Sequence, residues 1–181
     1  MKKSKKVTYS KEVLKHLKKY WQLSIRLFEE YDYALATFFS ITLIEEVGKI
    51  IYINRHKLAG IKKIYKKPIY NHNEKYIEAI LFSLPVNSRV ARIYKEQEHK
   101  FAKWLIKKTI FKIRNKSLYL DLVESKFQTP GQVISKEDAF LFVCFAGEIF
   151  AEVQGSILST SPENWQEIIN QIDDFRKRYQ E

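Results

Sequence analysis

The chain has 181 residues and a formal net charge of +11, with 45% hydrophobic residues, five glycines and four prolines. This length is typical of a single domain that can bury a core, and this composition excludes a low-complexity disordered chain. The charge favours contact with a polyanion such as RNA or with an anionic surface.

The N-terminus is rich in lysine, and no apolar segment follows it. It therefore lacks the pattern of a secretory signal, and we expect residues 1–9 to form a basic, flexible tail. We find no uninterrupted apolar run of the roughly 18 residues that span a bilayer. These features predict a soluble cytoplasmic protein with no membrane partner. The only cysteine, Cys144, lies in an apolar stretch and is expected to be a packed, inert thiol.

The first half of the chain predicts two helices followed by a basic segment. Apolar residues recur at three- and four-residue spacing over 10–30, and Asp32 can cap a second, central helix that runs to about Arg55. The segment 57–70 has no sustained period and is expected to be a loop or a broken helix. This segment contains Lys62, Lys63, Lys66, Lys67, Tyr65 and Tyr70. The lysines could pair with phosphates and the tyrosines could stack on bases, or the segment could simply be a solvated surface.

The second half predicts further helices with recognisable starts. Asn71 and Glu74 have capping-box spacing for a helix over 71–84, and a long helix is expected over 88–120. A connection over 122–134 precedes helices that begin at Ser135 and Ser161. We find no repeat and no domain boundary. We therefore predict one all-α domain over 1–181, a bundle of about five to six helices.

Charged residues interrupt the apolar stripe of the central helix. Glu46 shares this stripe with Leu35, Phe39, Leu43 and Ile50, and Lys49 lies within reach of Glu46 and of Glu45. One interpretation is a structural ion pair at a helix crossing. The alternative is that such a pair is kept for a function, because burying it is costly.

Two further polar groups occur in later helices. His72 is expected in the first turn of its helix, where the dipole favours a neutral ring that can act as a base; Lys75, three residues on, could hold a phosphate. A surface or capping histidine is the alternative. The second polar group, late in the long helix, consists of Arg114, Asn115, Tyr119 and Asp121. The arginine guanidinium offers a planar fork of donors for a phosphate, and the asparagine can fix a hydroxyl or orient the guanidinium.

Taken together, these motifs resemble the AbiV-type abortive-infection proteins, a branch of the HEPN superfamily. The resemblance covers most of the chain. Its landmarks in this sequence are Tyr33-Ala34-Leu35-Ala36, Ile44-Glu45-Glu46-Val47-Gly48-Lys49, His72 with Lys75, Arg114-Asn115-Lys116-Ser117-Leu118-Tyr119-Leu120-Asp121, and Thr129-Pro130.

The resemblance implies a helical bundle that pairs as a homodimer and defends bacteria against phage, with a phage-encoded protein as a candidate trigger. Many HEPN proteins are metal-independent ribonucleases, so no cofactor and no metal ligand is expected. By this resemblance Arg114 would stabilise the phosphorane and Asn115 would orient the reacting groups. Tyr119 occupies the position of the usual histidine. We therefore assign the base to His72 and the acid to Tyr119, with the Glu46–Lys49 pair holding the site in shape.

Two other readings compete with a ribonuclease. The first is a non-catalytic dimer that binds RNA, the ribosome or a phage protein and blocks translation. The second is a metal-loaded bundle, suggested by the Glu-x-x-His spacing of Glu96 and His99. Two such elements are needed for a di-iron site and only one is present, so this reading is disfavoured. The basic residues 176–178 suit the C-terminal end of their own helix and are assigned no function.

Overall fold

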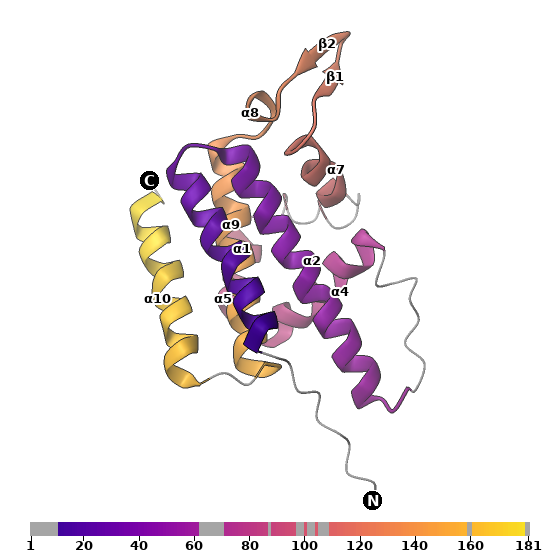
Figure 1. Cartoon of the computed structure of the whole chain (residues 1–181), viewed down its shortest axis with the longest axis vertical. Coiled ribbons are helices and arrows are strands. Elements are labelled where there is room, and N and C mark those ends of the chain that lie inside the picture. Colours follow the sequence, from indigo (N-terminus) through magenta and orange to yellow (C-terminus); the bar gives the residue numbers. More distant parts are fainter. Residues whose placement is uncertain are drawn as a thin grey trace, which may run out of the picture.

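A computed structural model describes residues 11–61, 71–86, 88–96, 100, 104, 109–158 and 161–179. Within these ranges the chain is an all-α bundle, as predicted, with one short hairpin that was not expected (Figure 1). The helices are α1 (Lys11–Glu29), α2 (Tyr33–Leu58), α4 (His72–Val86), α5 (Ser88–Glu96), α7 (Thr109–Lys116), α8 (Pro130–Val133), α9 (Lys136–Ser156) and α10 (Pro162–Tyr179). The described residues thus form eight helices, slightly more than the five to six expected.

The helix starts predicted from single polar residues are confirmed. Asp32 accepts a hydrogen bond from the Leu35 amide at 3.0 Å, and Ser135 accepts one from the Asp138 amide at 3.1 Å. Asn71 and Ser161 likewise accept from backbone amides two to three residues on. A side-chain oxygen in each case satisfies an amide that the first helical turn leaves without a partner.

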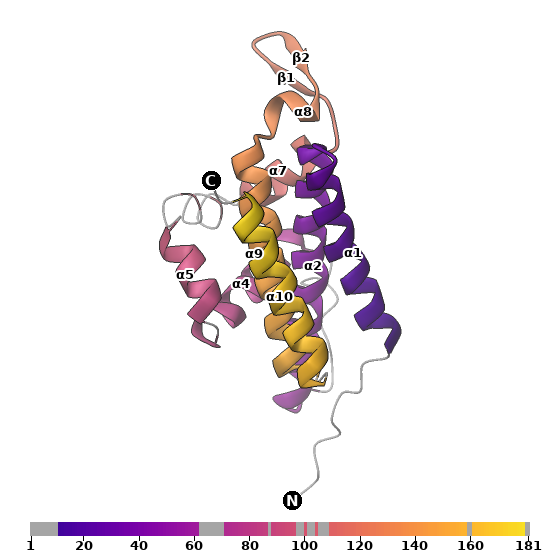
Figure 2. The ribbon, with the colours of Figure 1, turned by 90° about the vertical axis from the view of Figure 1, so that its left-hand side faces the viewer.

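Helix α2 lies at the centre of the bundle and packs against α1, α4 and α9 (Figures 1 and 2). Helix α10 covers α9 from the other side. The α1–α9 contact is close because Trp21, which is fully buried, lies directly over Gly147. A Cβ atom at this position would come within 2.5 Å of the indole ring, so a larger residue could not be accommodated without movement.

Helix α9 is apolar on nearly every face. It is long and apolar enough to cross a membrane, although no such run was recognised in the sequence, but 78% of the relevant window is buried inside the bundle. That burial is typical of a core helix. Cys144 lies within α9 and is buried, as predicted.

The predicted helix over 88–120 is wrong in its extent. Helix α5 ends at Glu96, and α7 spans only Thr109–Lys116 before the chain turns at Ser117. The predicted connection over 122–134 contains an antiparallel hairpin of β1 (Asp121–Val123) and β2 (Lys126–Gln128), followed by α8. Glu124 and Ser125 form its turn with φ values of 49° and 64°. Strands of three residues and a turn without glycine leave little periodic signal, which explains the error.

Some predictions lie outside the described residues. These concern the basic tail over 1–9, the lysines Lys62, Lys63, Lys66 and Lys67, and His99 of the Glu-x-x-His element. The central helix continues to Leu58, so the segment predicted as a loop from residue 57 begins slightly later.

Candidate functional site

A buried carboxylate forms the centre of the candidate site. Glu45 lies on α2, and 3% of its surface is exposed. Its Oε1 atom accepts a hydrogen bond from His72 Nδ1 at 2.5 Å and another from the hydroxyl of Tyr76. Both donors lie on α4, so the acid of one helix is satisfied by two side chains of its neighbour.

Two cationic side chains complete the surroundings of Glu45. Lys75 Nζ lies 3.6 Å from Oε2, and Arg114 Nε lies 3.8 Å from Oε1. Lys75 belongs to α4 and Arg114 to α7, so three helices meet at one carboxylate. One acid facing two cations leaves an excess of positive charge, which favours an anionic ligand. We call Glu45, His72, Lys75, Tyr76 and Arg114 the Glu45 cluster.

The Glu45 cluster depends on a close approach of α2 and α4. Gly48 lies one turn beyond Glu45, and a Cβ atom built on it would lie 2.0 Å from the backbone oxygen of Lys75. Only glycine allows the two backbones to come this near. The Gly48 position therefore explains how α4 side chains reach a carboxylate on α2.

His72 is held in one orientation and keeps one nitrogen available. Its ring stacks on Phe111 with centroids 5.0 Å apart, and the side chain is half-buried. Because a carboxylate only accepts hydrogen bonds, the Nδ1 atom that faces Glu45 carries the proton. In a neutral ring Nε2 then has a lone pair, and it has no hydrogen-bond partner among the residues that the structure describes.

Arg114 offers a cationic donor group to an anion. Its guanidinium lies over the ring of Phe38 at 4.9 Å, and its Nε makes no hydrogen bond within the described part of the chain. Among the described residues its one ion pair is the 3.8 Å approach to Glu45. A planar donor group that is fixed by an aromatic ring and incompletely paired is suited to a phosphate.

Burial shifts the pKa of two other groups in the Glu45 cluster. Burial lowers the pKa of the Lys75 ammonium, and the charge of Glu45 opposes this effect. Burial also raises the pKa of the Tyr76 hydroxyl, and negative Glu45 adds to the increase. Tyr76 therefore keeps its proton and serves as a hydrogen-bond donor rather than as a base.

Of the two neighbouring glutamates, Glu45 and not Glu46 lies beside His72 and Arg114. Glu46 forms the predicted ion pair with Lys49, at 2.5 Å, but both side chains are partly exposed. The buried acid that contacts His72 and Arg114 is Glu45. Helix α2 buries residues on almost every side, so an apolar stripe could not distinguish one glutamate from the next.

Other predicted residues lie apart from the Glu45 cluster. Tyr119 is 61% exposed in the turn after α7, and Asp121 pairs with Lys116 at 2.6 Å. The Asn115 backbone oxygen accepts hydrogen bonds from the amides of Leu118 and Tyr119, which terminates α7. Lys75, predicted to hold a phosphate, is buried beside Glu45.

Sequence reasoning missed Tyr76. His72, Lys75 and Tyr76 are spaced three and four residues apart, so they share one face of α4. That spacing was a usable signal, but a tyrosine at such a position is more often part of the apolar core.

A second buried ionic cluster joins α5, α9 and α10. Glu148 is fully buried and accepts hydrogen bonds from Arg89 Nε at 2.9 and 3.1 Å. Arg89 also pairs with Asp173 at 2.5 Å, and Arg176 approaches Glu148 at 3.8 Å. Arg176 was expected only to suit the end of its own helix, and the structure shows that it also faces a buried acid.

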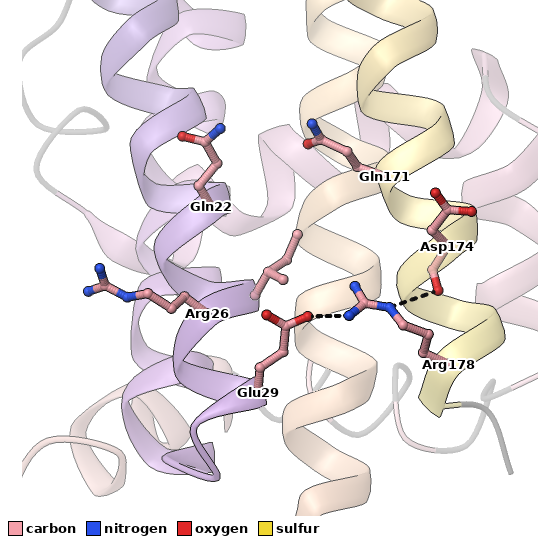
Figure 3. Close-up of a pocket in the computed structure, with 7 residues that line it drawn as sticks. Gln22, Arg26, Glu29, Gln171, Asp174 and Arg178 are labelled. Carbon is pink, nitrogen blue, oxygen red and sulfur yellow. Dashed lines mark hydrogen bonds and ion pairs between the residues drawn. The ribbon is translucent and has the colours of Figure 1, made fainter.

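A surface groove of about 300 Å³ lies between α1 and α10, away from the predicted residues (Figure 3). Two of its four charged side chains, Arg178 and Glu29, pair with each other across the groove. Arg178 bonds Glu29 at 2.6 Å and donates to the backbone oxygen of Asp174 at 3.4 Å. The Arg178–Glu29 pair joins α10 to α1, and the four charged side chains of the groove carry no net charge, so the groove lacks the excess positive charge of the Glu45 cluster.

The helical architecture, with an arginine near the end of α7 close to a buried acid on α2, agrees with the expected resemblance to HEPN domains. The profile of the AbiV family of HEPN domains matches residues 7–151, which extend from the start of α1 through most of α9. The chain belongs to the AbiV family. Comparisons with curated proteins and with solved structures gave no match.

Proposed function

We propose that this AbiV-family protein is an abortive-infection effector that cleaves RNA at the Glu45 cluster without a metal ion. The observation that carries the proposal is the His72–Glu45 hydrogen bond beside the incompletely paired Arg114. A base, a group that orients the base and a phosphate-binding cation then lie within one cluster of three helices.

In the proposed reaction, Nε2 of His72 takes the proton of a ribose 2′-hydroxyl, and the 2′-oxygen attacks the adjacent phosphorus. The bond from phosphorus to the 5′-oxygen breaks, and the leaving oxygen takes a proton from water. The products are a 2′,3′-cyclic phosphate and a 5′-hydroxyl end. Glu45 stabilises the imidazolium that forms, and Arg114 stabilises the charge on the phosphorane.

Tyr119 is 61% exposed, and within the described residues no hydrogen bond, ion pair or ring contact joins it to the Glu45 cluster. Its proposed role as an acid therefore stays a prediction. The tyrosine in place of the usual histidine favours the alternative function, a non-catalytic effector that binds RNA, the ribosome or a phage protein and blocks translation. Arg114 and the overall positive charge serve either function.

The test uses purified full-length protein, end-labelled RNA and a chelator. We expect cleavage with cyclic phosphate ends. Arg114→Ala is expected to lower the rate by about 10²–10³-fold and His72→Ala by about 10²–10⁴-fold. Arg26→Ala and His16→Ala replace the same residue types on the outer face of α1 and should leave the rate unchanged.

The outcomes separate the two functions. RNA that is bound but left intact would support the non-catalytic effector, and full activity in both site variants would refute the proposed site. In cells that express the protein, growth arrest and RNA integrity after infection provide the matching measurement, with the same four variants.

A further inference from the structure

Lys75 is the most deeply buried cation of the Glu45 cluster. Its side chain is 6% exposed, compared with 21% for Arg114 and 37% for His72. The ammonium lies 3.6 Å from Oε2 of Glu45, beyond ordinary hydrogen-bond distance, and no closer partner occurs among the described residues. An ammonium has three donors, and burying donors without partners is costly. Such a group is suited to an oxygen atom of a ligand that enters the cluster.

Lys75 and His72 approach the same carboxylate at different oxygen atoms. The imidazole contacts Oε1 of Glu45, whereas the ammonium faces Oε2. The two residues are three positions apart on α4, so they share one face of that helix. Helix α7, which carries Arg114, packs against both α2 and α4. A phosphate bound by Arg114 therefore has an imidazole and an ammonium as neighbours.

The proposed cleavage of RNA needs an acid as well as a base. The 5′-oxygen is a poor leaving group unless it gains a proton as its bond to phosphorus breaks. The attacking and leaving oxygens lie on opposite sides of the phosphorus, so the acid must be a different group from the base His72.

The described groups of the cluster differ in their ability to release a proton. The raised pKa of Tyr76 keeps its proton in place, and arginine is not deprotonated in proteins. Burial lowers the pKa of the Lys75 ammonium, although negative Glu45 opposes the change, and a lower pKa makes a stronger acid. Tyr119, which is 61% exposed, has no hydrogen bond to the cluster within the described residues.

We propose that Lys75 is the general acid of the RNA cleavage and gives a proton from Nζ to the leaving 5′-oxygen. As the 2′-oxygen bonds to phosphorus, the bond from phosphorus to the 5′-oxygen breaks, and its electron pair takes the proton. His72 holds the proton of the 2′-hydroxyl at this stage. After the products leave, His72 gives its proton to water and neutral Lys75 takes one from water, which restores both groups. This inference rests on the proposed function and replaces water by Lys75 as the proton donor.

The test uses the full chain and two RNAs that differ in one atom. The linkage that the wild type cleaves is mapped first, and its 5′-oxygen is then replaced by sulfur. A thiolate leaves readily without a proton, because a thiol is a much stronger acid than an alcohol. On natural RNA, Lys75→Met is expected to lower the cleavage rate by about 10²–10⁴-fold. On the sulfur RNA, Lys75→Met should cleave as fast as the wild type.

Three variants separate proton donation from charge and from folding. Lys75→Arg keeps the positive charge but cannot release a proton, so it should follow Lys75→Met on both RNAs. His72→Ala should stay slow on both RNAs, because sulfur does not replace the base. Lys18→Met removes a lysine that pairs with Glu167 on α10, and it should match the wild type on both RNAs. Rapid cleavage of the sulfur RNA by a Lys75 variant also shows that the variant is folded.

Several results would overturn the inference. Lys75→Met could be fully active on natural RNA, or it could be equally slow on both RNAs, which would mean that Lys75 acts through charge or structure alone. Sulfur could instead restore the rate of Tyr119→Phe, which would assign the acid to Tyr119. In each of these cases the wild type still cleaves RNA, so the proposed function survives. A wild type that cleaves neither RNA would refute the proposed function and this inference with it.

Discussion

Gly48→Ala tests whether the contact between α2 and α4 builds the candidate site. In an exposed helix this change stabilises the helix by about 1 kcal/mol, because alanine has the higher helix propensity. Here the added Cβ would lie 2.0 Å from the Lys75 backbone oxygen, whereas an ordinary contact is at least 3.4 Å. The backbones must separate by about 1.4 Å, since neither atom belongs to a flexible side chain.

We expect this separation to cost about 1–3 kcal/mol, the usual range for overpacking a core. In a chain of this size, each kcal/mol lowers the melting temperature by about 2–4 °C. Urea unfolding and calorimetry measure the two quantities. The control is Gly131→Ala in α8, where a Cβ would meet nothing within 4 Å. If Gly48→Ala is as stable as the control and keeps full activity, then the close crossing does not support the Glu45 cluster.

Three further predictions concern the buried ionic groups. Tyr76→Phe should lower the free energy of unfolding by about 1–3 kcal/mol in urea melts, because Glu45 loses a buried donor. Arg89→Met should cost about 3–5 kcal/mol by the same measurement, because Glu148 stays buried without its main partner. The hydrogen bond from Arg89 lowers the pKa of Asp173 below its ordinary value of about 3.9. A carboxyl group with a lowered pKa stabilises the fold at pH values above its ordinary pKa, and this stabilisation is lost as the pH falls through the lowered pKa. Asp173→Asn should therefore weaken the dependence of the melting temperature on acid pH.

Each of these changes has a matched control. Tyr119→Phe removes an exposed hydroxyl and should leave stability unchanged. Lys116→Met breaks the surface pair with Asp121 and should cost at most about 1 kcal/mol. Asp173→Asn introduced into Arg89→Met should add little to the acid dependence, because the donor is already gone. A larger effect from any control than from its partner would contradict the assigned contacts.

Local features of the fold could be predicted because short-range chemistry determines them. The caps at Asp32, Asn71, Ser135 and Ser161 depend on residues within one helical turn, and all four helices begin there. The hairpin could not be predicted in this way. Its strands are short, and its apolar residues face outward, so the usual alternation gives no reliable indication of which face is buried.

The candidate site was only partly predictable for a different reason. The sequence indicated that acid, imidazole and guanidinium groups from distant segments lie together, and the structure brings Glu45, His72 and Arg114 into contact range. Choosing between Glu45 and Glu46 required the rotation of α2 about its axis. Long-range packing sets that rotation, and a helix that is buried on most sides carries little trace of it in its sequence.

The two buried glutamates also limit how the helices can be assembled. Helices α2 and α9 are apolar over most of their surfaces, and hydrophobic attraction alone would accept several rotations or shifts of such helices. A shift of α4 along α2 by one turn, about 5.4 Å, would move His72 and Tyr76 away from Glu45 and leave a buried carboxylate without these hydrogen-bond donors. A comparable slip of α9 would do the same to Glu148 and Arg89. The buried carboxylates therefore raise the free energy of bundles with a shifted helix register, which apolar helix surfaces alone would allow.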